Sequence, residues 1–409
     1  MKAIERISQN LSTVLNQPGD WDPPAGIQPK KPVIPLHIGI PDPDYLPLAR
    51  LDSASRHLFS SNESGTWTYG FGPGFKPLRE AIAARWADQF GTEREADHFQ
   101  LTQGSSGAID MLGRALINPG DVILMEYPCY MGSYRNFRAL GAEIVFVQTD
   151  EEGIDIDHLR IQLKALSQQG RAPKFLYVVT EFNNPTGACL APHRRVELVQ
   201  ISQAFDLLIL DDAAYAELRF DKATSEDQKP SPLLATLADH RNIITVGSLS
   251  KTLATGLRIG WIYASPEWQE IIGQMRFAMG LNQQVVRVAH SLIEDGTYSA
   301  HVQMMRARYG QRMARLAAAL KDQCGDKIYT RLPTGGFYLW LKLTCDHTEV
   351  WRAAYEEGLH VIPGRNFCPP HPEGSSPGDY LRLAYPYTPI DQFEEAARRL
   401  AAAISRVMR

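Results

Sequence analysis

The sequence predicts an α/β protein in which a mostly parallel sheet carries helices on both faces and a smaller α+β domain follows. Between residues 99 and 265, short apolar runs rich in β-branched residues alternate with helical patterns. Several runs are apolar throughout, which is typical of strands buried on both faces. With 409 residues, 44% hydrophobic and 22% charged, the chain is large enough for two domains and has an ordinary globular composition.

The first 35 residues predict an arm that begins with a short amphipathic helix and continues through a segment rich in proline and glycine. A short strand from residue 37 then breaks into a turn, where Gly39 would let the backbone approach a ligand closely. The glycine-rich segment W-T-Y-G-F-G-P-G at 67–74 predicts a loop before a helix.

Six apolar runs predict the strands of the sheet, at residues 100–102, 122–125, 143–147, 175–180, 207–210 and 243–246. Residues 266–320 read as helical, and their long segment 298–320 would bridge two lobes. We therefore expect three parts: 1–50 as an N-terminal arm and part of the small domain, 51–295 as the large domain, and 296–409 as the small domain with its bridging helix.

Charge and cysteine content narrow the functional class. The net charge is −4 with no long basic run, which argues against a nucleic-acid surface as the main purpose. Five widely spaced cysteines form no C-x-x-C pair, so they support neither a metal site nor a disulfide framework. Neither a targeting segment nor a run of ~18 apolar residues is visible. These observations predict a cytoplasmic protein that does not bind membranes.

One lysine follows a predicted strand in an unusual setting. Lys251 comes after the buried run 243–246 and the small, hydroxyl-rich turn G-S-L-S. Open α/β sheets bind ligands at such strand ends. A partly desolvated lysine near a second cation, here Arg258, acquires a lowered pKa that suits Schiff-base chemistry. Taken alone, however, most lysines in such places are solvated surface groups.

Other strand ends carry complementary groups. Ser105 and Ser106 open a helix whose N-terminus can bind an anion, although Ser and Gly are also ordinary capping residues. Tyr130 could stack on a planar ring, Asn184 could bind a phenolic oxygen, and Asp212 could keep a pyridine nitrogen protonated. A lysine for an aldehyde completes a set that predicts pyridoxal 5′-phosphate (PLP) as the cofactor.

These motifs resemble those of the fold-type I, class I/II aminotransferases, within them the 2-aminoadipate/kynurenine branch. The resemblance runs from about residue 38 to 384. It rests on N-N-P-T-G at 183–187, D-D-A-A-Y at 211–215, G-S-L-S-K-T-L-A-T-G-L-R-I-G-W at 247–261 and R-L-A-Y at 382–385. It implies the PLP-transferase fold, with a mostly parallel seven-stranded sheet between helices in a large PLP-binding domain.

The resemblance also implies roles for individual residues. Lys251 would form the Schiff base with PLP and act as the base once the substrate frees it, while Asp212 would pair with the pyridine nitrogen. Asn184 and Tyr215 would bind the ring oxygen, and Tyr130 would stack on the ring. The implied phosphate ligands are Ser105, Ser106, Ser248 and Arg258.

Three further residues concern the substrate and the assembly. Arg382 matches the arginine that binds the substrate α-carboxylate, and Gly39 would line the substrate side with Asn184. Tyr69 matches a tyrosine that reaches the phosphate of the neighbouring subunit, so a homodimer with shared active sites is implied. The expected small-molecule partners are a 2-amino acid and a 2-oxo acid.

The sequence departs from this branch at Glu181, where T-E-F-N-N-P-T-G replaces the more usual segment. Glu181 could serve a cationic substrate or a second proton transfer, or it could be an ordinary ion-paired carboxylate. We find no clear second arginine for a side-chain carboxylate.

We therefore expect a PLP-dependent aminotransferase. One alternative is a non-transaminating PLP enzyme of the same fold, which would carry out β/γ-elimination, γ-replacement or C–C bond formation on an activated amino acid such as S-adenosylmethionine. A PLP-sensing binding protein without turnover is the alternative of another class.

Overall fold

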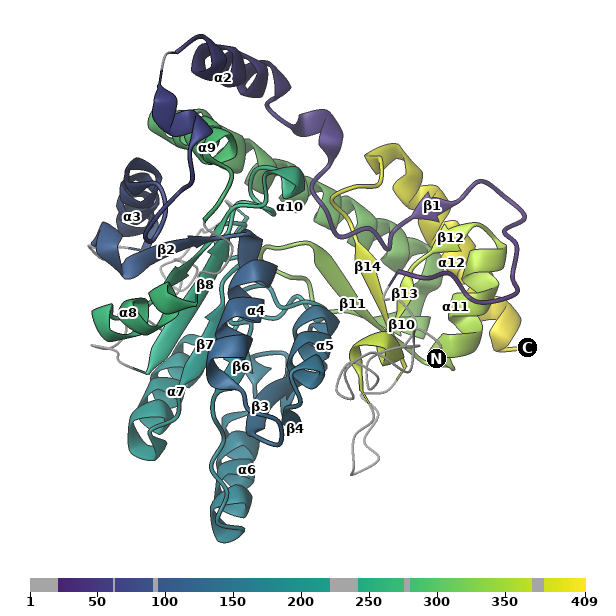
Figure 1. The fold of residues 1–409 in the computed structure, drawn as a ribbon. Helices are drawn as coiled ribbons and strands as arrows, with labels where there is room; N and C mark the ends of the chain where they lie inside the picture. The colour runs from purple at the N-terminus through teal and green to yellow at the C-terminus, as the bar shows by residue number, and fades with distance from the viewer. Residues whose placement is uncertain (1–20, 62, 91–94, 221–241, 276–279, 370–378) are drawn as a thin grey trace, which may run out of the picture.

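We describe a computed structural model of the chain, which covers residues 21–61, 63–90, 95–220, 242–275, 280–369 and 379–409. The helix expected near the N-terminus lies outside these residues. Two sheets organise the fold, a large one and a small one, and they lie side by side in Figure 1.

The large sheet has the strand order β2-β9-β8-β7-β6-β3-β4-β5. Its strands are β2 (Phe99–Thr102), β3 (Val122–Tyr127), β4 (Glu143–Asp150), β5 (Gly153–Ile154), β6 (Leu176–Val178), β7 (Ile209–Asp212), β8 (Ile243–Ser248) and β9 (Gly260–Tyr263). The five strands from β8 to β4 are parallel, and β2, β9 and β5 pair antiparallel.

The mostly parallel sheet is therefore confirmed, with eight strands in place of the seven expected. The additional strand is β5, a two-residue segment that folds back on the end of β4. Every residue of β3 and β8 is buried, which explains why these strands read as continuous apolar runs in the sequence.

Helices cover both faces of the large sheet, as Figure 1 shows. On one face α4 (Gly104–Leu116), α5 (Met131–Ala139) and α8 (Pro266–Gln274) share a core with the central strands. On the other face α6 (Ile156–Gln168) and α7 (Pro192–Phe205) build a second core. A third core joins α2 (Leu48–Ser60), α3 (Lys76–Phe90) and α9 (Gln283–Glu294) to β2 and β9. We call this part of the molecule the large lobe.

The small sheet is antiparallel, with the order β10-β11-β14-β13. Its strands are β10 (Ile328–Tyr329), β11 (Tyr338–Leu343), β13 (Ile362–Pro363) and β14 (Tyr380–Ala384). With α11 (His347–Glu356) and α12 (Phe393–Val407) it forms the small lobe. The 28-residue helix α10 (Thr297–Cys324) packs on both α9 and α12 and so links the lobes.

The N-terminal segment joins the small lobe, because β1 (Ile34–Pro35) pairs in parallel with β12 (Leu359–His360). We propose the domain division 1–50, 51–295 and 296–409, since the strands of the large sheet come from 99–263 and those of the small sheet from 328–384.

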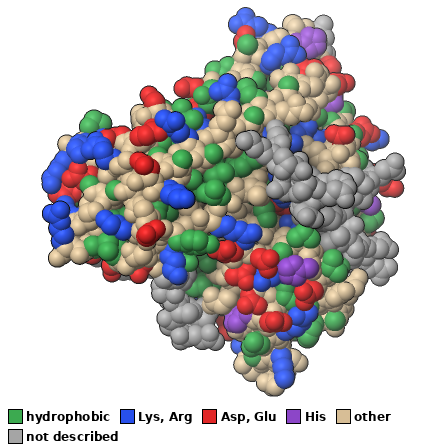
Figure 2. All heavy atoms as spheres, turned by 180° about the vertical axis from the view of Figure 1, so that it is seen from behind, with side chains coloured by type: hydrophobic (Ala, Val, Ile, Leu, Met, Phe, Trp, Pro, Cys, Tyr) green, Lys and Arg blue, Asp and Glu red, His purple; other side chains and the backbone are tan. Residues whose placement is uncertain are grey.

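The surface carries no large patch of one charge on the face seen in Figure 2, where acidic and basic side chains are interspersed. This agrees with a net charge of only −4. Within the described residues, no helix combines the length and the apolar character needed to cross a membrane.

Candidate active site

The carboxyl ends of four neighbouring parallel strands, β3, β6, β7 and β8, meet at one edge of the large sheet. A cavity of about 170 Å³ lies there and is closed on its other side by the small lobe. Its lining includes Gly39, Ser105, Ser106, Tyr130, Asn184, Asp212, Tyr215, Ser250, Lys251, Arg258, Tyr338, Phe367 and Arg382. Ten of the twelve residues singled out in the sequence are thus brought together.

Lys251 follows β8 and lines the cavity with its amine. Its Nζ donates a hydrogen bond to the Gly39 carbonyl at 3.0 Å. The Nζ also lies 5.8 Å from the centre of the Tyr215 ring and 5.7 Å from that of Phe337. Burial lowers the pKa of Lys251, and the positive charge of Arg382 acts in the same direction. The amine therefore becomes neutral, and hence basic, at a lower pH than a lysine in water.

Asp212 ends β7 and faces the same cavity. Its Oδ2 accepts a hydrogen bond from the Tyr177 hydroxyl at 2.7 Å, and its Oδ1 accepts one from the Ala214 amide at 3.2 Å. Burial raises the pKa of Asp212, while the bond from Tyr177 opposes that rise. The arrangement leaves a buried carboxylate held in one orientation and ready to pair with a cationic ring nitrogen.

The N-terminus of α4 forms an anion cradle with Arg258. Ser105 and Ser106 lie in its first turn, where free backbone N–H groups and the helix dipole favour negative charge. Gly104 has φ +69°, and a Cβ there would lie 2.9 Å from Nη2 of Arg258. Arg258 itself adopts a left-handed conformation with φ 51° and donates to the Ser250 hydroxyl at 3.3 Å. A phosphate fits this cradle.

Ser248, an implied phosphate ligand, is not among the residues that line the cavity, and its role in phosphate binding stays a prediction. Its hydroxyl donates to the Ile259 carbonyl at 3.3 Å and accepts from the Ser250 amide at 3.1 Å. It stabilises the turn before Lys251, whereas Ser250, two residues later, lines the cavity. Both serines lie in one short turn, and the sequence alone did not show which of them faces the ligand.

Arg382, on β14, faces the cavity from the small lobe. Its guanidinium donates to Oδ1 of Asn184 at 2.9 Å and to the His37 carbonyl at 3.0 Å. It lies over the rings of Tyr338 and Phe367, at 4.4 and 4.7 Å from their centres. The buried Nε finds no hydrogen-bond partner within the described part of the chain. A planar, buried and incompletely paired guanidinium suits a carboxylate ligand.

Gly39 is required sterically at the wall of the cavity. A Cβ at this position would lie 2.3 Å from the Tyr338 hydroxyl, so any larger residue would displace that tyrosine. The Tyr338 hydroxyl lies 3.1 Å from that of Tyr215. Burial raises the pKa of Tyr215, so it remains a neutral hydroxyl that can donate to a ligand oxygen.

Tyr69 lies apart from this cavity in the chain described. It belongs to the loop before α3, and its side chain is 68% exposed beside Phe71. The cavity also contains residues that the sequence analysis missed, notably Trp21, Ser250, Tyr338 and Phe367. Except for Ser250, they come from segments far from the motifs, and nothing local in the sequence connects them with the site.

Glu181 is an ion-paired carboxylate inside the protein. It is buried outside the cavity, where its carboxylate accepts from Arg195 at 2.5 Å and from Arg219 at 3.2 Å. With both oxygens engaged by guanidinium groups, Glu181 is a structural ion-paired carboxylate. Because both of its oxygens are paired, Glu181 gives no support for a cationic substrate or for a second proton transfer.

A larger cavity of about 450 Å³ lies between the lobes, bordered by Trp340, Tyr380 and the turn at 186–189. Its acidic groups are already engaged: Asp150 pairs with Arg194 at 2.6 Å, and Glu151 accepts from the Tyr329 hydroxyl at 2.6 Å. Size alone would favour this cavity, but the reactive groups converge in the smaller one.

Comparison with known proteins also indicates a PLP-dependent aminotransferase. The family model of aminotransferase class I and II matches residues 31–400. An aromatic-amino-acid aminotransferase of Thermococcus litoralis is 28% identical over 92% of this chain and 89% of its own. A 2-aminoadipate transaminase of Thermus thermophilus is 30% identical over an alignment that covers 90% of this chain and 89% of that protein. A crystal structure of Pyrococcus horikoshii kynurenine aminotransferase with PMP superposes with a TM-score of 0.85 at 26% sequence identity. The superposition covers 93% of this chain and 92% of that structure.

These matches confirm the fold-type I architecture, transamination as the activity and PLP as the cofactor, as expected from the motifs. The chemistry of the anion cradle, the buried carboxylate and the lysine fits that cofactor. The chain belongs to the aminotransferase class I and II family.

Proposed function

We propose that this cavity is the catalytic site and that Lys251 carries the central step. PLP, when bound, supplies an aldehyde that takes up the amino group and a ring that withdraws electrons. The Lys251 Nζ would accept the proton from the α-carbon of the amino acid. Its lowered pKa favours the neutral amine that this task needs. The hydrogen bond to the Gly39 carbonyl orients the amine.

The remaining residues would hold the cofactor and the substrate. Asp212, fixed by Tyr177, would pair with the ring nitrogen, and Asn184 with Tyr215 would bind the ring oxygen. Tyr130 would stack on the ring. The phosphate would lie among Ser105, Ser106, Ser250 and Arg258, with Ser248 supporting the turn.

Arg382 would bind the substrate α-carboxylate, because it is the buried guanidinium whose hydrogen-bonding capacity is incompletely used at the cavity. Five aromatic side chains line the cavity, those of Trp21, Tyr130, Tyr215, Tyr338 and Phe367. We infer that the amino donor has an aromatic or apolar side chain and that a 2-oxo acid is the acceptor. One similar protein is named an aromatic-amino-acid aminotransferase, which supports this inference, whereas another is named a 2-aminoadipate transaminase.

We also propose a homodimer. Phe59, Trp67, Tyr69 and Phe71 are each more than half exposed and lie near one another in sequence. Phe59 contacts Trp67, and Tyr69 contacts Phe71. Exposed aromatic groups of this kind mark interaction surfaces. A second copy of the chain covering them would also allow Tyr69 to reach the phosphate of the neighbouring site, which light scattering and Tyr69→Phe titrations with PLP can test.

The protein is expected to work in the cytoplasm. Its five cysteines, Cys129, Cys189, Cys324, Cys345 and Cys368, are all free, which suits a reducing compartment.

The decisive experiment is a half-reaction without an oxo acid. Purified protein loaded with PLP should be converted to the pyridoxamine form by a panel of amino acids, with aromatic members fastest, while Lys251→Ala should lose both the visible absorbance of bound PLP and turnover. S-adenosylmethionine belongs in the panel. Consumption of any member while the aldehyde form persists would contradict transamination and favour elimination or replacement chemistry.

A further inference from the structure

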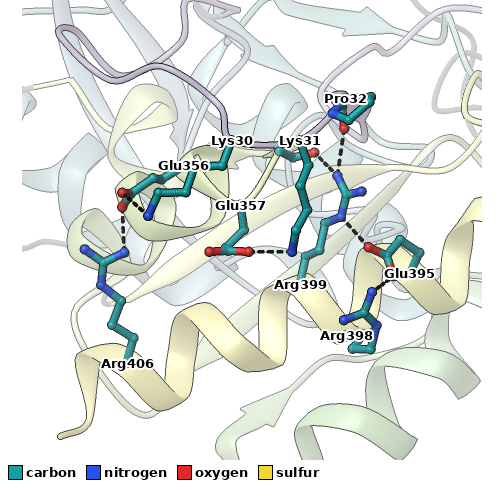
Figure 3. A network of polar contacts seen from close by, with 10 residues as sticks. Lys30, Lys31, Pro32, Glu356, Glu357, Glu395, Arg398, Arg399 and Arg406 are labelled. Carbon is teal, nitrogen blue, oxygen red and sulfur yellow. Dashed lines mark hydrogen bonds and ion pairs between the residues drawn. The ribbon is translucent and has the colours of Figure 1, made fainter.

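The segment 30–39, which we call the strap, lies along the small lobe before it reaches the active site. Figure 3 shows its first residues beside α11 and α12. The Lys30 amide donates to the Glu356 carbonyl at 2.7 Å, and the Ile34 amide donates to the Gly358 carbonyl at 2.8 Å. Two ion pairs, Lys30 with Glu356 and Lys31 with Glu357, are each 2.7 Å long.

These two ion pairs are weak anchors, because the Lys30 and Lys31 side chains are 61% and 42% exposed. Arg399 on α12 is different. Its side chain is only 9% exposed, and its Nη1 donates to the Pro32 carbonyl at 2.7 Å and to the Gly358 carbonyl at 2.8 Å. Its Nε donates to Glu395 at 2.7 Å, which fixes the guanidinium (Figure 3).

The other end of the strap contacts two cationic groups of the active site, Arg382 and Lys251. The His37 carbonyl accepts from Nη2 of Arg382, and the Gly39 carbonyl accepts from Nζ of Lys251, each at 3.0 Å. Between the two ends, the Leu36 carbonyl accepts from the Ala384 amide at 2.7 Å. The strap is thus a hydrogen-bonded chain segment that runs from Arg399 to the active site.

We propose that Arg399 is a positioning residue for the reaction: by clamping the strap at Pro32 and Gly358, it sets where the His37 and Gly39 carbonyls hold Arg382 and Lys251. The inference rests on the proposed roles of these two residues in binding the carboxylate and moving the proton. A displacement of about 1 Å at such groups is enough to change catalysis strongly.

The experiment compares Arg399→Ala with Arg398→Ala in the PLP-loaded full chain. Arg398 is the neighbouring arginine on α12 and also pairs with Glu395, but its side chain is 61% exposed. Within the described part of the chain its polar contact is with Glu395, so it is a matched control. We expect Arg399→Ala to speed hydrogen exchange at the Lys30 and Ile34 amides and Arg398→Ala to leave it unchanged. Arg399→Lys, which keeps a charged donor near the carbonyls, should restore much of the protection.

The functional readout is the pair of dissociation constants for L-phenylalanine and 2-phenylethylamine, measured by absorbance titration. Because Arg382 would act on the carboxylate alone, Arg399→Ala should weaken L-phenylalanine binding by roughly tenfold and change amine binding by less than about twofold. Equal weakening of both ligands, or unchanged exchange in the strap, would overturn the proposal. A wild-type protein that does not distinguish the two ligands would instead contradict the proposed role of Arg382. In that case the hydrogen-exchange data would still test whether Arg399 holds the strap in place.

Discussion

Asp211 and Asp212 are neighbours on β7, yet they belong to two different polar clusters. Adjacent residues of a strand point to opposite faces. Asp212 faces the cavity, where it accepts from Tyr177 near Lys251. Asp211 faces away and accepts from the Thr180 hydroxyl at 2.7 Å, close to Glu181 and Arg195. One cluster is open to a ligand and the other is closed within the protein.

The two clusters differ in where their unsatisfied groups lie. Each holds a buried polar atom without a hydrogen-bond partner among the described residues, Oδ2 of Asp211 in the closed cluster and Nε of Arg382 in the open one, and Arg382 lines the cavity. In the closed cluster Glu181 engages two guanidinium groups, and Arg195 also donates to the carbonyls of Thr180 and Leu190. In the open cluster Arg382 keeps a buried N–H without a described partner, and the pKa of Lys251 is lowered. Burial of charge alone therefore does not mark a catalytic group; incompletely satisfied charge beside a cavity is the better indicator.

The strongest test of this difference is Arg382→Lys in the open cluster. A lysine keeps the charge but cannot hold Asn184, the His37 carbonyl and a carboxylate with one planar group. We expect kcat/KM for the preferred amino acid to fall by roughly 100-fold, with little change in the visible absorbance of bound PLP. Arg365→Lys, an exposed arginine of the small lobe, is the control. A loss confined to PLP binding would show that Arg382 holds the cofactor instead.

The matching test in the closed cluster is Glu181→Gln. Removing this charge leaves Arg195 buried without its carboxylate, which should lower the free energy of unfolding by about 3 kcal/mol. The surviving folded enzyme should keep its KM and its absorbance. Glu143→Gln, which removes an exposed pair with Arg171, should cost under ~1 kcal/mol in the same urea titration. A changed KM for a cationic amino acid would return Glu181 to the list of substrate ligands.

The sequence was sufficient to predict the elements whose information is local. Lys251, Asp212 and Asn184 lie at or after the end of a strand that is recognisable from its apolar run, and parallel strands carry such residues to one edge. The resemblance of the motifs then indicated the cofactor and the fold. The bounds of the strands agreed with the structure to within a few residues.

What the sequence could not show depends on contacts between distant segments or on the geometry of a turn. The partners of Glu181 lie 14 and 38 residues further on, on α7 and after β7. Tyr338 and Phe367 reach the cavity only because the small sheet packs over it. The sequence also contained no signal for Ser250, which lines the cavity two residues after Ser248, whose hydroxyl donates to the Ile259 carbonyl. The short strand β5 has too few residues to produce a periodic signal.

The last expected effect concerns the pH dependence of stability in the closed cluster. Burial raises the pKa of Asp211 from 3.8 to about 7, so the folded protein favours the neutral acid and loses stability as pH rises through that interval. Asp211→Asn removes this titration while keeping an oxygen for Thr180. The variant should therefore gain stability relative to the wild type between pH 4 and 8, by at most about 4 kcal/mol. Urea midpoints across this range would measure it, and a constant difference between the two proteins would mean that Asp211 stays ionised in the closed cluster.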